Sequence, residues 1–134
     1  MESNLITVIH KAFKGETGHN IVAYIKVNPA AHVDDSLEYA YELTQNKKGS
    51  WSKGKYRKDG SLNKDYRESI YFVGQYPARK SDGFQLGARS TSEGDEMVYK
   101  GVRYEVAAWG FEELPKYGPH LTQALAEIKA KEAV

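Results

Sequence analysis

The sequence contains no cysteine among its 134 residues. Disulfide bonds, thiolate nucleophiles and zinc sites built on thiolates are therefore excluded, because each of them needs a cysteine sulfur. A chain without cysteine is compatible with a reducing compartment, so we expect a cytoplasmic location. The length fits a single domain over residues 1–134, long enough to bury a core without covalent staples.

Long apolar runs are also lacking. No stretch approaches the roughly 20 apolar residues that a membrane helix needs. Residues 1–13 carry an acid at Glu2, whereas a secretory signal begins with basic residues. We therefore expect neither a membrane segment nor a signal peptide.

Patterns that mark metal sites and active sites are missing as well. The histidines stand at positions 10, 19, 32 and 120 without metal-ligand spacing, and no nucleophile elbow surrounds any serine. The adjacent carboxylates Asp34 and Asp35 precede a predicted helix, which explains them as caps. We expect no metal, no cofactor and no membrane partner, and an enzyme is the least favoured class of function.

Charge is unevenly distributed along the chain. Residues 47–68 hold eight bases and three acids, so this segment has a formal charge of +5. Because the total is +1, the remainder has a charge of −4. The near-neutral total therefore hides a basic loop on a mildly acidic body.

Two strands are predicted at residues 5–13 and 21–27. In the second segment apolar residues at 21, 23, 25 and 27 alternate along the chain, as in a half-buried strand. Gly15 and Gly18 lie between the segments and suit a turn, so we expect an antiparallel hairpin. A further short strand is expected at residues 70–73.

Two helices are predicted. The first spans residues 36–45, with Asp35 as N-cap and Glu38 at the spacing of a capping box. Its apolar stripe consists of Leu37, Ala40, Tyr41 and Thr44. The second begins near Pro119, and its apolar stripe consists of Leu121, Ala124, Leu125 and Ile128.

The clearest hairpin is expected at residues 96–108. Lys100 and Gly101 separate two apolar segments, and a two-residue loop ending in glycine suits a tight primed turn. The predicted order is β-β-α-loop-β-β-β-α. We therefore expect a small α+β fold, with a mainly antiparallel sheet and two helices, one after the N-terminal hairpin and one at the C-terminus.

Two segments resemble a family of small proteins encoded by bacteriophages and other mobile elements. Residues 37–52 read LEYAYELTQNKKGSWS, and residues 89–114 read RSTSEGDEMVYKGVRYEVAAWGFEEL. The matching positions are Leu43, Thr44, Gln45, Ser50, Trp51, Ser52, Arg89, Ser90, Thr91, Ser92, Gly94, Asp95, Gly110 and Phe111. The likeness covers about a third of the chain, and it implies a phage or plasmid setting without implying an activity.

The basic loop is the leading candidate for a binding site. Cationic side chains neutralise phosphates, and aromatic rings stack on nucleobases. The combination of basic and aromatic residues in this loop therefore suits binding to nucleic acid or to a protein partner. The candidate residues are Lys47, Lys48, Trp51, Lys53, Lys55, Tyr56, Arg57 and Lys58. Low apolar content and dense like charge also predict that residues 47–68 are mobile, and a solvated loop without a ligand is the alternative.

The turn at residues 89–95 is a candidate anion-binding turn. Arg89, Ser90, Thr91 and Ser92 offer a guanidinium and hydroxyls that could hold a phosphate. The favoured alternative is structural: the hydroxyls satisfy backbone groups, and Asp95 fixes the following strand. A phosphate loop normally precedes a helix, whereas this turn precedes a strand.

Together these features favour a small non-enzymatic binding protein of a phage or mobile element. Its target would be a host or phage macromolecule, as for an anti-defence or host-takeover inhibitor. Two alternatives remain open: a nucleic-acid-binding accessory protein that uses the basic loop, and a minor virion component that packs through a sheet edge or the C-terminal helix.

Overall fold

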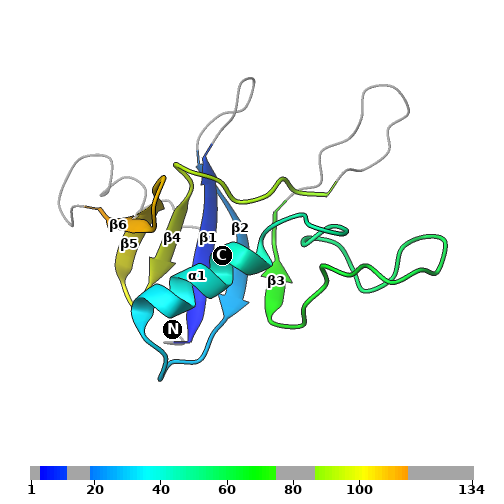
Figure 1. Ribbon diagram of the computed structural model, residues 1–134, viewed down its shortest axis with the longest axis horizontal. Helices are drawn as coiled ribbons and strands as arrows, with labels where there is room; N and C mark the ends of the chain where they lie inside the picture. Colours follow the sequence, from blue (N-terminus) through cyan, green and yellow to red (C-terminus); the bar gives the residue numbers. More distant parts are fainter. Residues whose placement is uncertain (1–3, 12–18, 75–86, 115–134) are drawn as a thin grey trace.

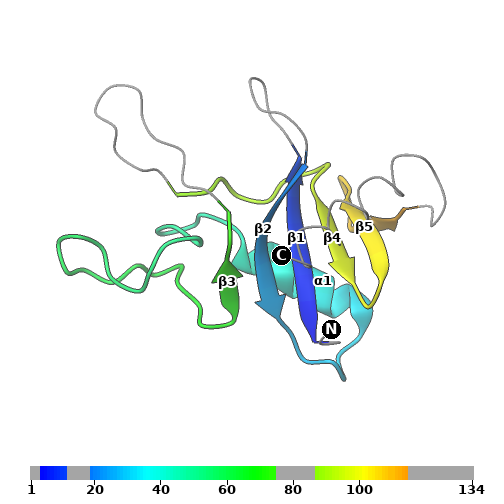
Figure 2. The same cartoon turned by 180° about the vertical axis from the view of Figure 1, so that it is seen from behind.

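The described part of the chain folds as a helix packed on one face of a six-stranded antiparallel sheet (Figure 1). The structure is a computed structural model that describes residues 4–11, 19–74 and 87–114. The strands are β1 (Leu5–Lys11), β2 (His19–Lys26), β3 (Ile70–Phe72), β4 (Glu96–Tyr99), β5 (Val102–Val106) and β6 (Phe111–Glu113), and the helix is α1 (Val33–Leu43). Their order across the sheet is β3-β2-β1-β4-β5-β6. Seen from behind, the sheet lies in front of α1 (Figure 2).

Strand β1 lies in the middle of the sheet, and its residues from Ile6 to His10 are buried on both faces. It pairs with β2 on one side and with β4 on the other. Ile6 and Val8 are fully buried, as are Leu37 and Ala40 of α1. These residues belong to the main hydrophobic core. Truncating a buried leucine such as Leu37 to alanine typically lowers the free energy of unfolding by about 2–5 kcal/mol.

Helix α1 begins earlier than the sequence predicts. Its N-cap is His32, whose Nδ1 accepts a hydrogen bond from the Asp34 amide at 3.2 Å. Asp34 and Asp35 therefore lie inside the first turn, where their charge favours the positive end of the helix dipole. The prediction of Asp35 as N-cap is wrong, because an imidazole nitrogen takes the place of the expected carboxylate.

The β4–β5 hairpin is confirmed. Lys100 has φ 51° and Gly101 has φ 76°, the two positive values that a tight primed turn requires. The pairing of β1 with β2 and the short strand at β3 are also confirmed. The loop at residues 14–18 lies outside the described residues.

Strand β6 was not predicted. After β5 the chain turns through residues 107–110, where Gly110 has φ 74°, and Phe111 returns opposite Val106. Three residues are too few to show an alternating pattern, so the one local feature of this strand is an aromatic residue after a glycine.

The expected class, a small α+β fold with a mainly antiparallel sheet, is confirmed in its coarse form. The second predicted helix, near residues 119–128, lies outside the described residues. Within the described ranges α1 is the one helix, and it is too short to cross a membrane.

Candidate functional site

The turn before β4 is organised around the carboxylate of Asp95, which is fully buried. The Arg89 guanidinium donates two hydrogen bonds to it, at 2.6 and 2.8 Å. The backbone amides of Lys11 and Ser92 donate two more, at 2.9 and 2.8 Å. The carboxylate thus ties the end of β1 to the start of β4.

These donors control the pKa of Asp95. Burial on its own raises that pKa, because it removes the charged form from water. The Arg89 hydrogen bonds act in the opposite direction, followed by those of the two amides and by the nearby His10. The donors outweigh burial, so the pKa lies below its ordinary value and the carboxylate stays ionised near neutral pH.

His10 occupies the interior beside this carboxylate. Its Nε2 lies 2.8 Å from the Thr91 hydroxyl and 3.9 Å from Asp95 Oδ2. Its ring meets the edge of Trp51 at a centroid distance of 6.1 Å. The same ring nitrogen faces both the hydroxyl and the carboxylate, whereas a catalytic triad uses the two different nitrogens.

Thr91 is also 1 % exposed, so no substrate reaches its hydroxyl in this structure. No cluster of three metal-ligating side chains occurs among the described residues. The polar cluster around Asp95 is therefore best interpreted as a structural element.

The cluster joins the two segments that carry the family resemblance. The end of α1 contacts residues 88–91 through two hydrogen bonds. Thr91 N donates to Thr44 O, and Gln45 Nε2 donates to Thr91 O. Trp51 Nε1 donates to Arg89 O at 2.9 Å. Positions 38 or more residues apart in sequence thus form one contiguous unit.

In the candidate anion-binding turn, these contacts are made within the chain. Arg89 binds Asp95, Ser90 Oγ accepts the Asn46 amide at 2.8 Å, and Thr91 contacts His10. Ser92 bonds to Asp95 through its amide. The anion held by this turn is the chain's own carboxylate, as the structural interpretation of the turn requires.

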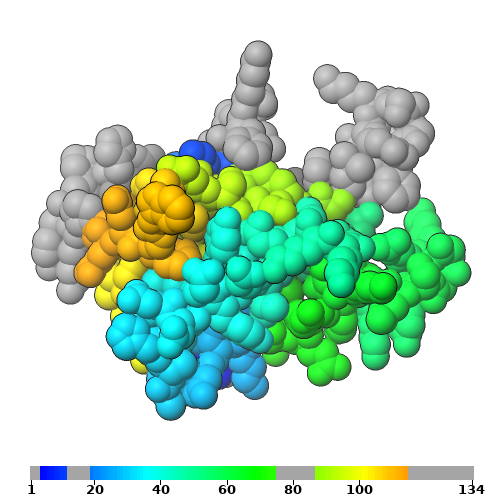
Figure 3. Space-filling model, viewed as in Figure 1, coloured from blue at the N-terminus to red at the C-terminus, as the bar shows by residue number. Residues whose placement is uncertain are grey.

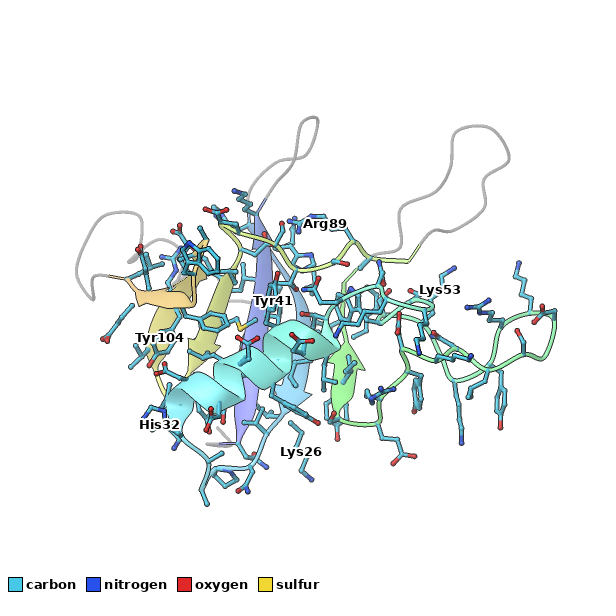
Figure 4. All side chains as sticks on the ribbon, viewed as in Figure 1. Lys26, His32, Tyr41, Lys53, Arg89 and Tyr104 are labelled. Atoms are coloured by element: carbon cyan, nitrogen blue, oxygen red, sulfur yellow. The ribbon has the colours of Figure 1, made fainter. Side chains whose placement is uncertain are left out.

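The basic loop forms a projecting arm, which we define as residues 53–67 (Figure 4). Arg57 N donates to Ser61 O and Asn63 N donates to Lys55 O, both at 2.8 Å. Tyr56 and Leu62 face each other in an antiparallel bridge. The arm therefore has a hairpin-like body that extends from the β3 end of the sheet.

Two polar residues anchor the base of the arm. Asn63 is 3 % exposed, and its side chain accepts from Ser50 N and donates to Ser50 O and Gly54 O. The Asp65 carboxylate accepts the amides of three successive residues, 47, 48 and 49. These amides outweigh the opposing effect of burial and hold the pKa of Asp65 below its ordinary value.

The arm's basic side chains lie on its surface. Lys55, Arg57, Lys58, Lys64 and Arg67 are exposed, and Lys53 is half-buried. Lys47 and Lys48 are exposed just before the arm, where Lys47 forms an ion pair with Glu42. The arm's acids are largely bound to backbone: Asp59 accepts the Ser61 amide at 2.9 Å, and Asp65 accepts the three amides above.

Trp51 does not belong to this exposed set. It is 1 % exposed, and its ring packs edge-on against Phe72 at 5.6 Å and against His10. The assignment of Trp51 as a stacking platform is therefore wrong in this structure, because the indole fills the core. Tyr56, at 66 % exposure, is an arm aromatic that a ligand can reach.

Sequence reasoning missed His10, Asn63 and Asp65. Each acts on partners at least nine residues away, beyond the reach of local patterns. One signal was available. The three backbone amides of residues 47–49 follow the predicted helix and need hydrogen-bond acceptors, which indicates that an acidic side chain lies nearby. Asp65 was the nearest downstream acid other than Asp59.

The fold and these contacts define a small α+β protein with a buried polar cluster and a basic arm. Comparison of the chain with models of protein families, with curated proteins and with solved structures finds no match. The likeness to mobile-element proteins therefore stays an expectation drawn from the residues.

Proposed function

We propose that this chain is a non-enzymatic binding protein of a phage or mobile element, and that its basic arm contacts the phosphate backbone of nucleic acid. The supporting observation is the arm itself, a hairpin-like projection with five exposed bases. The six bases of the arm outnumber its two acids, Asp59 and Asp65, so the arm has a formal charge of +4.

The distribution of charge also favours the arm as the contact. Outside residues 47–68 the chain has a formal charge of −4, so the body repels phosphate while the arm attracts it. The anchors Asn63 and Asp65 hold the base of the arm in place before any ligand binds. Less ordering entropy then opposes binding than for a flexible basic tail.

Tyr56 supplies a second kind of contact. Its ring is 66 % exposed, and Lys55 Nζ lies 5.7 Å from the ring centroid. An exposed aromatic ring beside a cation suits stacking on an unpaired base. We therefore expect single strands to gain more from Tyr56 than duplexes do.

Fluorescence anisotropy with labelled duplex DNA, single-stranded DNA and RNA tests the proposal. Lys55→Gln should weaken binding to all three, because phosphate contacts position a protein without reading sequence. Lys26→Gln is the matched control, since Lys26 is also exposed but lies at the end of β2. Equal losses for the two variants, or no binding to any probe at low salt, would contradict the proposal.

Three finer expectations belong to the same proposal. The target lies in the cytoplasm of a host cell, the class of role is anti-defence or host takeover, and residues near 119–128 form the second helix. The helix is tested by comparing the circular dichroism of the full chain with that of the variant Leu125→Pro. If the helix is present, the variant should lose helical signal, because proline breaks a helix interior.

A further inference from the structure

We propose that the β6 end of one copy of this chain binds the basic arm of a second copy. The β6 end is defined as residues 105 and 109–113. This self-association needs no nucleic acid, although both contacts use the arm.

Trp109 is the first observation. Its side chain is 94 % exposed, the highest exposure among the large apolar residues described. The tight turn that carries it is closed by Ala107 N donating to Gly110 O at 3.0 Å, and Gly110 has φ 74°. The turn therefore presents the indole to solvent, and a tryptophan in this setting is a typical anchor of protein interfaces.

The edge of the sheet is the second observation. Ala107 N donates to Gly110 O, and Leu114 N donates to Arg103 O. The backbone N–H and C=O groups of the even-numbered residues in and beside β6 therefore point toward β5. By the alternation of an antiparallel pair, the backbone groups of Phe111 and Glu113 point outward. Within the described residues no strand pairs with this side of β6.

Charge is the third observation. Glu112 lies directly opposite Glu105 across the β5–β6 pair, and like charges in that position repel. The adjoining Glu96 is different, because Arg103 donates to it at 2.7 Å and balances it. Glu112 and Glu113 are exposed, so cations from another molecule would relieve the repulsion.

The basic arm complements this end in both charge and apolar character. Tyr56 and Leu62 form an exposed apolar pair, at 66 % and 51 %, surrounded by basic side chains. Trp109 can pack on that pair while the bases meet Glu112 and Glu113. An interface with an aromatic anchor and a charged rim has this composition.

The geometry favours a second copy over a contact within one chain. The arm and the β6 segment lie at opposite ends of the described body, the arm in green and β6 in orange (Figure 3). Pairing of two β6 edges is disfavoured, because it would bring acids from both copies together. The arm-to-edge contact uses two different surfaces, so it generates open chains or closed rings.

Sedimentation velocity on nucleic-acid-free protein tests the proposal. The mean mass should rise with concentration at about 0.05 M salt and fall toward the monomer at about 0.5 M, since rim charges are screened. Trp109→Ala should weaken association by about tenfold or more, as loss of a buried anchor does. The matched control is Tyr71→Ala, at an exposed aromatic of β3 that belongs to neither defined surface, and it should leave association unchanged.

Charge reversal gives the sharpest result. Glu112→Lys with Glu113→Lys makes a basic edge, and Lys55→Glu with Lys58→Glu and Lys64→Glu changes the formal charge of the arm from +4 to −2. Each variant should be monomeric alone, because its own arm and edge repel. Their mixture should associate, because every arm then finds an edge of opposite charge.

A wild-type chain that stays monomeric at low salt and high concentration overturns the proposal. So does association of the edge-reversed variant alone at wild-type strength, or a mixture that remains monomeric while both variants keep their circular dichroism spectra. These outcomes are measured without nucleic acid. They therefore test self-association separately from the proposed binding of nucleic acid by the arm.

Discussion

The Arg89 guanidinium holds the buried Asp95 carboxylate through two hydrogen bonds, at 2.6 and 2.8 Å. The pair closes the turn before β4, and the Lys11 amide connects it to β1 in the centre of the sheet. This arrangement makes the turn a structural junction between β1 and β4.

Asp95→Asn should destabilise the fold by about 2–4 kcal/mol, because the partly buried Arg89 loses its counter-charge and its amide partners lose an ionised acceptor. Urea unfolding followed by circular dichroism measures the difference. The control is Asp59→Asn, whose exposed carboxylate bonds to the neighbouring Ser61, and it should unfold close to wild type. Similar midpoints for Asp95→Asn and wild type would argue against the junction.

The stability of the wild type should depend on pH through Asp95. Its pKa is lowered on folding, so the stabilisation is complete above the unfolded pKa of about 4 and is lost as pH falls through the lower folded value. The gap between wild type and Asp95→Asn should therefore be constant from pH 7 to about 5 and shrink in more acidic solution. A gap that widens below about pH 4 would contradict this assignment.

The β4–β5 turn predicts a difference between two glycines. Gly101→Val should cost about 1–3 kcal/mol, because φ 76° is strained for a β-branched residue. Gly54→Val should cost much less, since Gly54 has no positive φ and open space beside it. Thermal midpoints of the two variants decide the point, and equal values would count against the turn.

The sequence predicts that residues 47–68 are mobile, and the contacts at the base of the arm refine that hypothesis. Amides 47–49 bond to Asp65, so hydrogen exchange should be slow there and fast at exposed residues 58–59 near the tip. Asp65→Ala should speed exchange at 47–49 and leave β1 unchanged. Strong protection across 53–64 in the isolated protein would show that the arm is rigid.

Local patterns predicted the parts of the fold that local chemistry determines. The Lys100–Gly101 turn was identifiable because a two-residue loop dictates its own backbone geometry. His32 as N-cap was not, since aspartate competes for that position and only the preceding chain path decided between them. The helix therefore started three residues before its predicted position.

The site was harder to predict because its contacts are distant in sequence. Trp51 looked like a stacking residue within a basic segment, yet its partners are Phe72 and the Arg89 carbonyl. Nothing within ten residues of Trp51 signals those contacts. Asp65 likewise looked like a surface acid, and only the fold brings it to the amides of residues 47–49.

The salt dependence of nucleic-acid binding tests the central claim most directly. With Lys53, Lys55, Arg57 and Lys58 all changed to glutamine, the logarithmic salt slope on duplex DNA should fall by up to about 3–4, at about 0.9 per lost phosphate contact. Tyr56→Ala should lower single-strand affinity while the slope stays near wild type, because stacking releases no counterions. An unchanged slope in the quadruple variant, or wild-type binding that is insensitive to salt, would contradict the account.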